Sequence, residues 1–210
     1  MKIHVGIPRD GLVLDERRIR LLEGSPEAHN DPVLQAALRA LQTPSREASL
    51  ETSGPASQRR ISFAYGPDLV AVLLARQDRP LELAAITHDS VPAVIAKTLG
   101  LGPARAPEAH VLSVANAEIV ALTRPPFAVT GGLSDSPLGR RLAEKSWGVA
   151  RFETRLHSSQ DRDADEASFE ILGAAQTGWW WIKRGRRHAS LVPTRPAMIW
   201  GLLSSVLGED

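Results

Sequence analysis

The pattern of hydrophobic positions predicts a mixture of helices and strands in this chain. Apolar residues recur at helical spacing in residues 33–41, 91–99, 138–142 and 198–207. Alternating or short apolar runs typical of strands occupy residues 48–52, 61–65, 81–85, 149–156, 169–171, 179–183 and 188–192. Residues 69–75 are almost continuously apolar, which indicates a strand covered on both faces.

Residues that favour helix ends and tight turns separate these stretches. Short turns such as Ser53-Gly54-Pro55 and Arg184-Gly185-Arg186 favour antiparallel neighbours, because a parallel pair needs a long crossover. Residues suited to cap a helix precede each helical stretch: Asp31, Asp89 or Ser90, Asp135 and Thr194. The pattern therefore predicts an α+β fold in which helices pack on a central antiparallel sheet.

The second half of the chain repeats the layout of the first. Two sets of positions recur 104 residues later: Asp31, Leu34 and Leu38 as Asp135, Leu138 and Leu142, and Pro92, Ala93, Ile95 and Leu99 as Pro196, Ala197, Ile199 and Leu203. We therefore predict two helix–four-strand–helix units, residues 31–102 and 135–208, related by a pseudo-twofold axis within a single domain of residues 1–210.

The remaining segments are less regular. Residues 12–22 are predicted to form a strand and a short helix, and the polar residues 158–167 are predicted to form a flexible loop. Residues 103–134 are rich in Pro and Gly and are interpreted as a linker that contains a short helix around residues 114–122. Gly131-Gly132 lacks the surrounding residues of a phosphate-binding loop and is interpreted as part of this linker.

Composition narrows the class of protein. The chain is 43% hydrophobic and 23% charged, as is usual for a soluble globular protein. The net charge of +1 gives no general attraction to nucleic acid or to anionic membranes. The absence of cysteine excludes disulfides and fits a reducing compartment. The first residues lack a secretory signal, and no apolar stretch approaches the roughly 20 residues that span a bilayer, so we expect a cytoplasmic protein.

Three consecutive tryptophans form the most distinctive stretch. In a strand, Trp179 and Trp181 point to one face and Trp180 to the other. Either one face exposes large aromatic area, which commonly marks an interaction hot spot, or helices cover both faces. We predict that this strand contacts a partner, through residues Trp179, Trp180, Trp181, Ile182, Lys183 and Arg184.

Residues 183–188 are basic and follow the tryptophans, which makes single-stranded nucleic acid an alternative ligand. These charges flank a hairpin turn, where solvated arginine is common, so no nucleic-acid partner is expected. A general module that binds a small ligand or nucleic acid remains the alternative function.

No set of residues predicts catalysis, a metal site or a cofactor. The six histidines are scattered without metal-ligand spacing. His88-Asp89-Ser90 contains the residue types of a catalytic triad, but three adjacent residues cannot adopt its geometry, and we interpret them as a strand end and a helix cap. Residues 161–166 resemble the start of a calcium loop, but Glu166 stands where glycine is required. We therefore expect neither an enzyme nor a bound cofactor or metal.

The order of elements resembles the EspG family, the cytosolic chaperones of type VII (ESX) secretion in actinobacteria. Three stretches carry the resemblance over most of residues 12–208: the helix at 31–41 followed by Thr43-Pro44, the strands ending at 81–86 followed by the helix at 92–99, and Gly178-Trp179-Trp180-Trp181 leading through a hairpin into 191–197 and an apolar final helix. Relative to the family, the chain is short and its N-terminal segment is reduced.

The resemblance implies a quasi-twofold fold with a central antiparallel sheet and two helical bundles. It also implies a function, since EspG proteins bind the apolar tip of a PPE protein in a PE–PPE heterodimer and keep it soluble until export. We therefore expect a monomer or weak homodimer that acts as a non-enzymatic chaperone of a helical secretion substrate. The resemblance assigns no contact residue by position.

Overall fold

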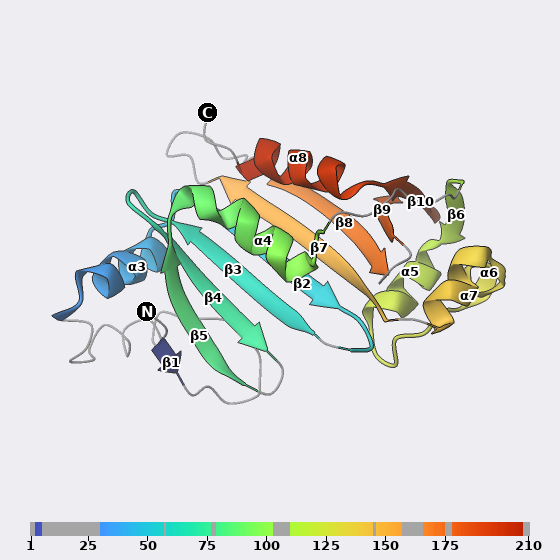
Figure 1. The fold of residues 1–210 in the computed structure, drawn as a ribbon, viewed down its shortest axis with the longest axis horizontal. Coiled ribbons are helices and arrows are strands. Elements are labelled where there is room, and N and C mark those ends of the chain that lie inside the picture. Colours follow the sequence, from blue (N-terminus) through green and yellow to red (C-terminus); the bar gives the residue numbers. More distant parts are fainter. Residues whose placement is uncertain are drawn as a thin grey trace. The chain divides into compact units, whose positions relative to one another are not determined.

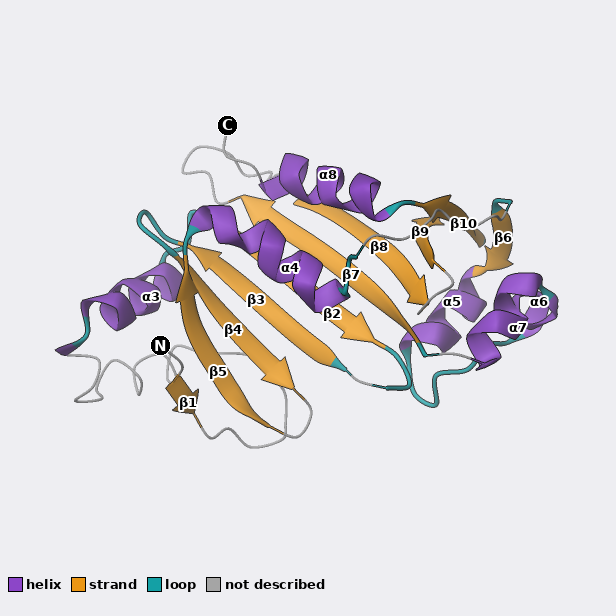
Figure 2. Cartoon of the chain, in the orientation of Figure 1, coloured by secondary structure: helices purple, strands orange, loops and turns teal. Residues whose placement is uncertain are grey.

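The computed structural model describes residues 3–5, 30–56, 58–76, 79–102, 110–144, 146–156, 166–174 and 178–207. Its strands are β1 (Ile3–Val5), β2 (Arg46–Ser53), β3 (Arg59–Tyr65), β4 (Val70–Arg76), β5 (Arg79–Ile86), β6 (Leu112–Ala115), β7 (Trp147–Leu156), β8 (Glu166–Ala174), β9 (Gly178–Arg184) and β10 (His188–Thr194). Its helices are α3 (Pro32–Gln42), the 3₁₀ turn η1 (His88–Ser90), α4 (Val91–Leu99), α5 (Asn116–Thr123), α6 (Gly131–Asp135), α7 (Pro137–Glu144) and α8 (Pro196–Leu207) (Figures 1 and 2).

The strands form one hydrogen-bonded sheet in the order β1-β5-β4-β3-β2-β7-β8-β9-β10-β6. The pairs β1–β5, β5–β4, β4–β3, β8–β9, β9–β10 and β10–β6 are all antiparallel. The predicted α+β class with a central antiparallel sheet is therefore confirmed. A helix, four strands and a helix follow one another twice, as α3, β2–β5, α4 and as α7, β7–β10, α8. The pseudo-twofold relationship between these halves stays a prediction.

Contacts divide the chain into two compact units, each of which is described by itself. Unit 1 contains residues 1–50, 59–93 and 153–167, and unit 2 contains residues 51–58, 94–152 and 168–210. The long strands β2 and β7 each contribute residues to both units. None of the helices in the described ranges combines the length and the apolar character needed to cross a membrane.

In unit 1, helix α3 packs on β3, β4 and β5. Asp31 caps the helix as predicted, since its Oδ1 accepts hydrogen bonds from the amides of Val33 (2.9 Å) and Leu34 (3.1 Å). The apolar positions of α3 and the facing strand residues form one buried cluster: Leu34, Ala37, Leu38, Ala40, Ala64, Ala71, Leu73, Ala75 and Leu83. In β4, residues 70–73 are all buried, so the predicted coverage on both faces is confirmed.

Tyr65 ends β3 and is only 5% exposed. Its ring centroid lies 5.8 Å from that of His88, and the guanidinium carbon of Arg46 lies 5.6 Å from the same ring centroid. Burial raises the pKa of Tyr65 to about 12, and the positive charge of Arg46 opposes part of that increase. The phenol is therefore neutral at any physiological pH.

In unit 2, helices α5, α6 and α7 cover one side of the strands. Their apolar side chains join those of the strands in a second buried cluster, which includes Ile119, Leu122, Leu133, Leu138, Leu142, Trp147, Leu172, Trp180, Ile182 and Leu191. Helix α7 begins after Ser136, whose Oγ accepts a 2.9 Å hydrogen bond from the amide of Gly139. Asp135, the residue expected to cap this helix, is instead the last residue of α6. The cap therefore lies one residue beyond the position that the repeat predicted.

Two glycines allow the short helices of unit 2 to approach their neighbours. A Cβ on Gly139 would collide with the carbonyl oxygen of Leu133, and one on Gly131 (φ +60°) would lie 2.8 Å from Oε1 of Glu118. Glu118 Oε2 also accepts a 2.8 Å hydrogen bond from the amide of Leu133. The interpretation of Gly131-Gly132 as linker is therefore wrong, because these residues open α6 against the side chain of α5.

Other local predictions fall partly or wholly outside the described residues. The short helix expected around residues 114–122 is α5, preceded by strand β6. Residues 12–22 and 158–165 lie outside the described part of the chain, whereas Glu166 and Ala167 belong to β8 rather than to a loop. Strand β5 begins at Arg79, two residues before the apolar alternation of residues 81–85.

Candidate functional site

Strand β9 places the six predicted partner-binding residues on two different faces. Trp180 and Ile182 are 1% and 3% exposed and belong to the core of unit 2. Trp179 and Trp181 are half-buried on the opposite face, and Lys183 and Arg184 are exposed. The predicted alternation of the three tryptophans is confirmed. Trp180 and Ile182 lie on the face that α5–α7 cover, and partner contact by the six residues stays a prediction.

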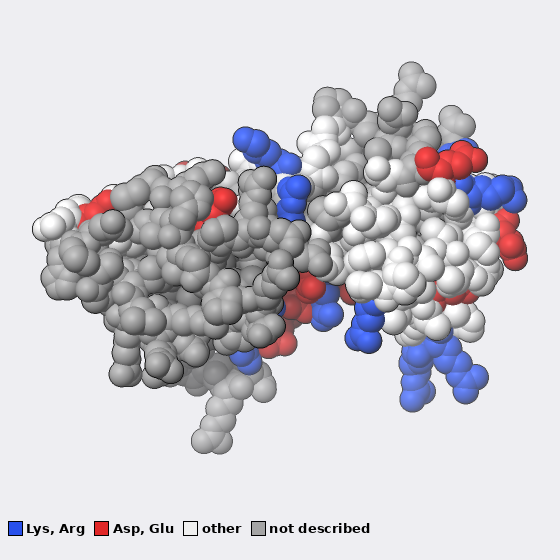
Figure 3. Space-filling model, turned by 90° about the horizontal axis from the view of Figure 1, so that it is seen from below, with Lys and Arg blue, Asp and Glu red and all other residues white. Residues whose placement is uncertain are grey.

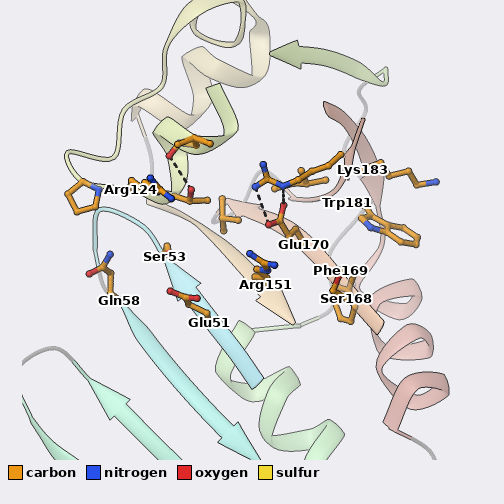
Figure 4. A pocket seen from close by; sticks show the side chains of 16 residues that line it. Glu51, Ser53, Gln58, Arg124, Arg151, Ser168, Phe169, Glu170, Trp181 and Lys183 are labelled. Atoms are coloured by element: carbon orange, nitrogen blue, oxygen red, sulfur yellow. Dashed lines mark hydrogen bonds and ion pairs between the residues drawn. The ribbon is translucent and has the colours of Figure 1, made fainter. Parts of the chain in front are cut away.

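A depression of about 870 Å³ adjoins β9 within unit 2. Its lining comes from β2 and the turn after it, the end of α5, and strands β7, β8 and β9 (Figure 4). Trp181, Ile182, Lys183 and Arg184 all contribute to this lining. The structure thus brings the basic end of β9 together with segments far away in the sequence.

Charged side chains of opposite sign follow one another across the depression. They lie on four neighbouring strands of the sheet, as Glu51 on β2, Arg151 on β7, Glu170 on β8 and Arg184 on β9. Arg184 donates two hydrogen bonds to Glu170, from Nε to Oε2 at 2.6 Å and from Nη2 to Oε1 at 3.1 Å (Figure 4). Opposite charges on adjacent strands attract, so Glu170 of β8 balances the positive charge of Arg184 on β9.

Arg124 adds a further cation at the rim, where α5 ends. The four residues Glu51, Arg124, Arg151 and Glu170 were missed by sequence reasoning. No signal in the linear sequence connects them, because only the strand order and register bring them to one depression.

The other face of β9 is aromatic. The Trp179 ring packs against Gly173 of β8, its cross-strand partner, where a Cβ would collide with the indole. The Nζ of Lys183 lies 4.8 Å from the centroid of the Trp181 ring, within the range of a cation–π contact. The Lys183 ammonium group therefore lies over one face of the half-buried Trp181 ring.

Helix α8 differs from its prediction in which residues it buries. Ile199, Leu203 and Leu207 are buried, at a spacing of one helical turn. Met198, expected on the apolar face, is 61% exposed, and Trp200 is 42% exposed. Met198 lies one position away from the buried stripe, which turns it about 100° toward solvent.

No group of three His, Asp or Glu side chains in the described part of the chain is placed to hold a metal ion. His88 Nε2 lies 2.9 Å from the carbonyl oxygen of Gly66, and Ser90 Oγ lies 2.8 Å from Thr87 Oγ1. These contacts tie η1, which lies between β5 and α4, to its surroundings. Residues 88–90 are therefore a 3₁₀ turn rather than a strand end, and capping of α4 by Asp89 or Ser90 stays a prediction.

Comparison with known proteins shows a likeness in fold. No family model matches the sequence, and no curated protein matches it. The structure is similar to that of the Mycobacterium tuberculosis type VII secretion system chaperone EspG5, solved in complex with a PE25–PPE41 dimer. The match has a TM-score of 0.54 and 12% sequence identity, and it covers 85% of this chain and 78% of EspG5. The chain therefore has an EspG-like fold.

Proposed function

We propose that this protein is a non-enzymatic, cytoplasmic chaperone of the EspG family that serves type VII secretion. Its substrate would be an aggregation-prone helical protein of the PE/PPE type, bound as a heterodimer by a chaperone that is a monomer or weak homodimer. The observation that carries the proposal is the EspG-like fold over 85% of the chain. Residues 1–210 would then act as one domain, with repeat units 31–102 and 135–208 connected by residues 103–134, which contain β6 and α5.

The depression of unit 2 is the surface that we assign to the substrate. It is concave, it adjoins the predicted partner-binding residues, and it carries both signs of charge. A helical tip that entered the depression would place its own charged side chains against those of Arg124, Arg151 and Glu51. In the view of Figure 3, the surface over α5–α7 carries few charged side chains, with Lys, Arg, Asp and Glu at its edges. Protein–protein interfaces are likewise depleted of charged residues at their centre and have a polar rim.

Co-expression with PE–PPE pairs from the same genome tests the proposal. We expect one pair to become soluble and to co-purify with the chain. Arg124→Glu reverses a charge at the depression and is expected to weaken co-purification. Arg39→Glu makes the same change on the exposed side of α3 in unit 1 and is expected to leave co-purification intact. Failure of every pair to co-purify in soluble form would contradict the chaperone assignment.

A nucleic-acid-binding module is the second candidate, because Lys183, Arg186, Arg187 and His188 are exposed around one hairpin. Such binding would weaken steeply with salt. Nucleic-acid binding would be favoured by a gel shift of labelled single-stranded DNA that appears at low salt and disappears at roughly 0.2 M salt, where such phosphate contacts weaken strongly. No shift at any salt concentration would exclude it.

A further inference from the structure

Helix α8 presents an unusually apolar surface to solvent. Its sequence, PAMIWGLLSSVL, contains no charged residue. Beyond the stripe that packs on the strands, it exposes Met198 (61%) and Trp200 (42%). The exposed face of a surface helix normally carries charged or polar side chains, and the exposed side of α8 carries only Ser204 and Ser205 of this kind. Exposed apolar area of this kind commonly marks a contact with another protein.

A groove of about 300 Å³ runs between α8 and the strands beneath it, entirely within unit 2. Its lining includes Ile171 and Trp181 from the strands and Met198, Gly201, Leu202 and Ser205 from the helix. Thr194 Oγ1 donates a hydrogen bond to Met198 Sδ at 3.8 Å, which holds the thioether at the groove. Met side chains adapt readily to different apolar partners.

Gly201 has no role inside the chain that requires a glycine. A Cβ placed on it meets no atom of the described residues within 4 Å, and its φ is not positive. Glycine within a helix is less favourable than alanine, so Gly201 lowers the stability of α8. No contact with the described residues requires a glycine there. A missing Cβ at the wall of an apolar groove does allow the backbone of another helix to approach closely.

The charge beside the groove is positive. Lys183 lies over the Trp181 ring that forms part of the groove, and Trp181 is shared with the depression. Among the described residues, no carboxylate forms an ion pair with Lys183. None of the groove-lining residues is acidic or basic. An occupant with an apolar stripe and a carboxylate at the Lys183 end would match both features.

We propose that this groove is a second docking site, which takes an amphipathic helix of another protein with an acidic residue directed at Lys183. The site lies on the Trp181 face of β9, whereas the Arg184–Glu170 pair lies on the opposite face. It shares Trp181 and Lys183 with the substrate surface assigned above and extends beyond that surface over α8, and a protein without chaperone activity would retain it.

A labelled helical peptide tests the site on the full-length chain. The probe is an 18-residue fluorescein-labelled peptide with leucines at helical i, i+4, i+7 and i+11 spacing and one glutamate at the end of that stripe; its matched control has lysine in place of the glutamate. Fluorescence anisotropy is expected to show at least tenfold tighter binding of the glutamate peptide. Lys183→Glu is expected to reverse this preference, and Arg186→Glu, the same change on the exposed hairpin, to leave it unchanged.

Gly201→Leu fills the groove and is expected to weaken binding of the glutamate peptide at least tenfold. Because open space surrounds this position, its thermal midpoint should not fall below that of the wild type. Met198→Glu provides a second disruption should Gly201→Leu fail to fold. Equal binding of both peptides, or wild-type affinity in both variants, would overturn the proposal. The proposal would also be overturned if light scattering showed that the wild type is a dimer and that Gly201→Leu is a monomer. The occupant of the groove would then be a second copy of this chain.

Discussion

Arg184 and Glu170 form a paired hydrogen bond across two neighbouring strands, with N–O distances of 2.6 and 3.1 Å. The Glu170 side chain is 12% exposed and that of Arg184 is 39% exposed. Glu170 is directly opposite Ile182 in the ladder, so the bond runs diagonally to the residue two positions further along β9. A strand that appears strongly basic in the sequence is thus partly neutralised by its neighbour.

Arg184→Leu is expected to lower the free energy of unfolding by about 1–2 kcal/mol, because it leaves the mostly buried Glu170 carboxylate without its donor. The partial exposure of Arg184 keeps the loss toward the lower end of that range. Urea unfolding measures the effect. Arg186→Leu, the same change at an exposed hairpin residue, should alter stability by less than about 0.5 kcal/mol. Equal effects of the two variants would show that the pair contributes nothing.

Gly139 and Gly201 are expected to respond oppositely to alanine. Gly139→Ala should destabilise the protein by about 1–3 kcal/mol, since the new Cβ collides with the Leu133 carbonyl and separates α7 from α6. Gly201→Ala should stabilise it by up to about 1 kcal/mol, because alanine is the better helix former and has free space. The thermal midpoints of the two variants test this expectation. A Gly139→Ala variant with a higher midpoint than the wild type would show that α6 and α7 do not meet at this glycine.

The helix caps allow a test of the repeat. Asp31→Ala is expected to cost about 1 kcal/mol, and Ser136→Ala a similar amount, because each removes a side-chain acceptor from a first helical turn. Asp135→Ala should change stability by less than about 0.5 kcal/mol. Chemical denaturation of the three variants gives the comparison. A full capping cost at Asp135 would place the second cap where the 104-residue offset predicted it.

The ionisation of Tyr65 is expected near pH 12. The chain contains a single tyrosine, so absorbance at 295 nm follows this phenol alone. Its folded pKa of about 12 lies above the unfolded value of 10.0. Burial of Tyr65 therefore stabilises the fold fully below pH 10, and this contribution is lost as the pH rises from 10 toward 12. A titration midpoint near 10 under native conditions would mean that Tyr65 is accessible to solvent.

Most elements were predictable from local signals. The alternation in residues 61–65 and the continuous run in 69–75 identified β3 and β4, since a strand needs only its own pattern to reveal which faces are buried. Asp31 was predictable as a cap because capping depends on a few adjacent residues. The short helix α6 was missed, because its first turn depends on Glu118, which lies far from it in the sequence.

The sequence alone determined the α+β class, the alternation of the three tryptophans and the absence of a recognisable catalytic motif. These properties follow from periodicity and residue type, which act over a few neighbouring positions. The tertiary structure decided that Trp180 belongs to the core while Trp181 remains half-exposed, that Arg184 is paired with Glu170, and that α8 leaves Met198 and Trp200 in solvent. Which face of a strand or helix is covered depends on the strand register and on the elements packed against it. These relationships join residues far apart in the chain, and no local pattern encodes them.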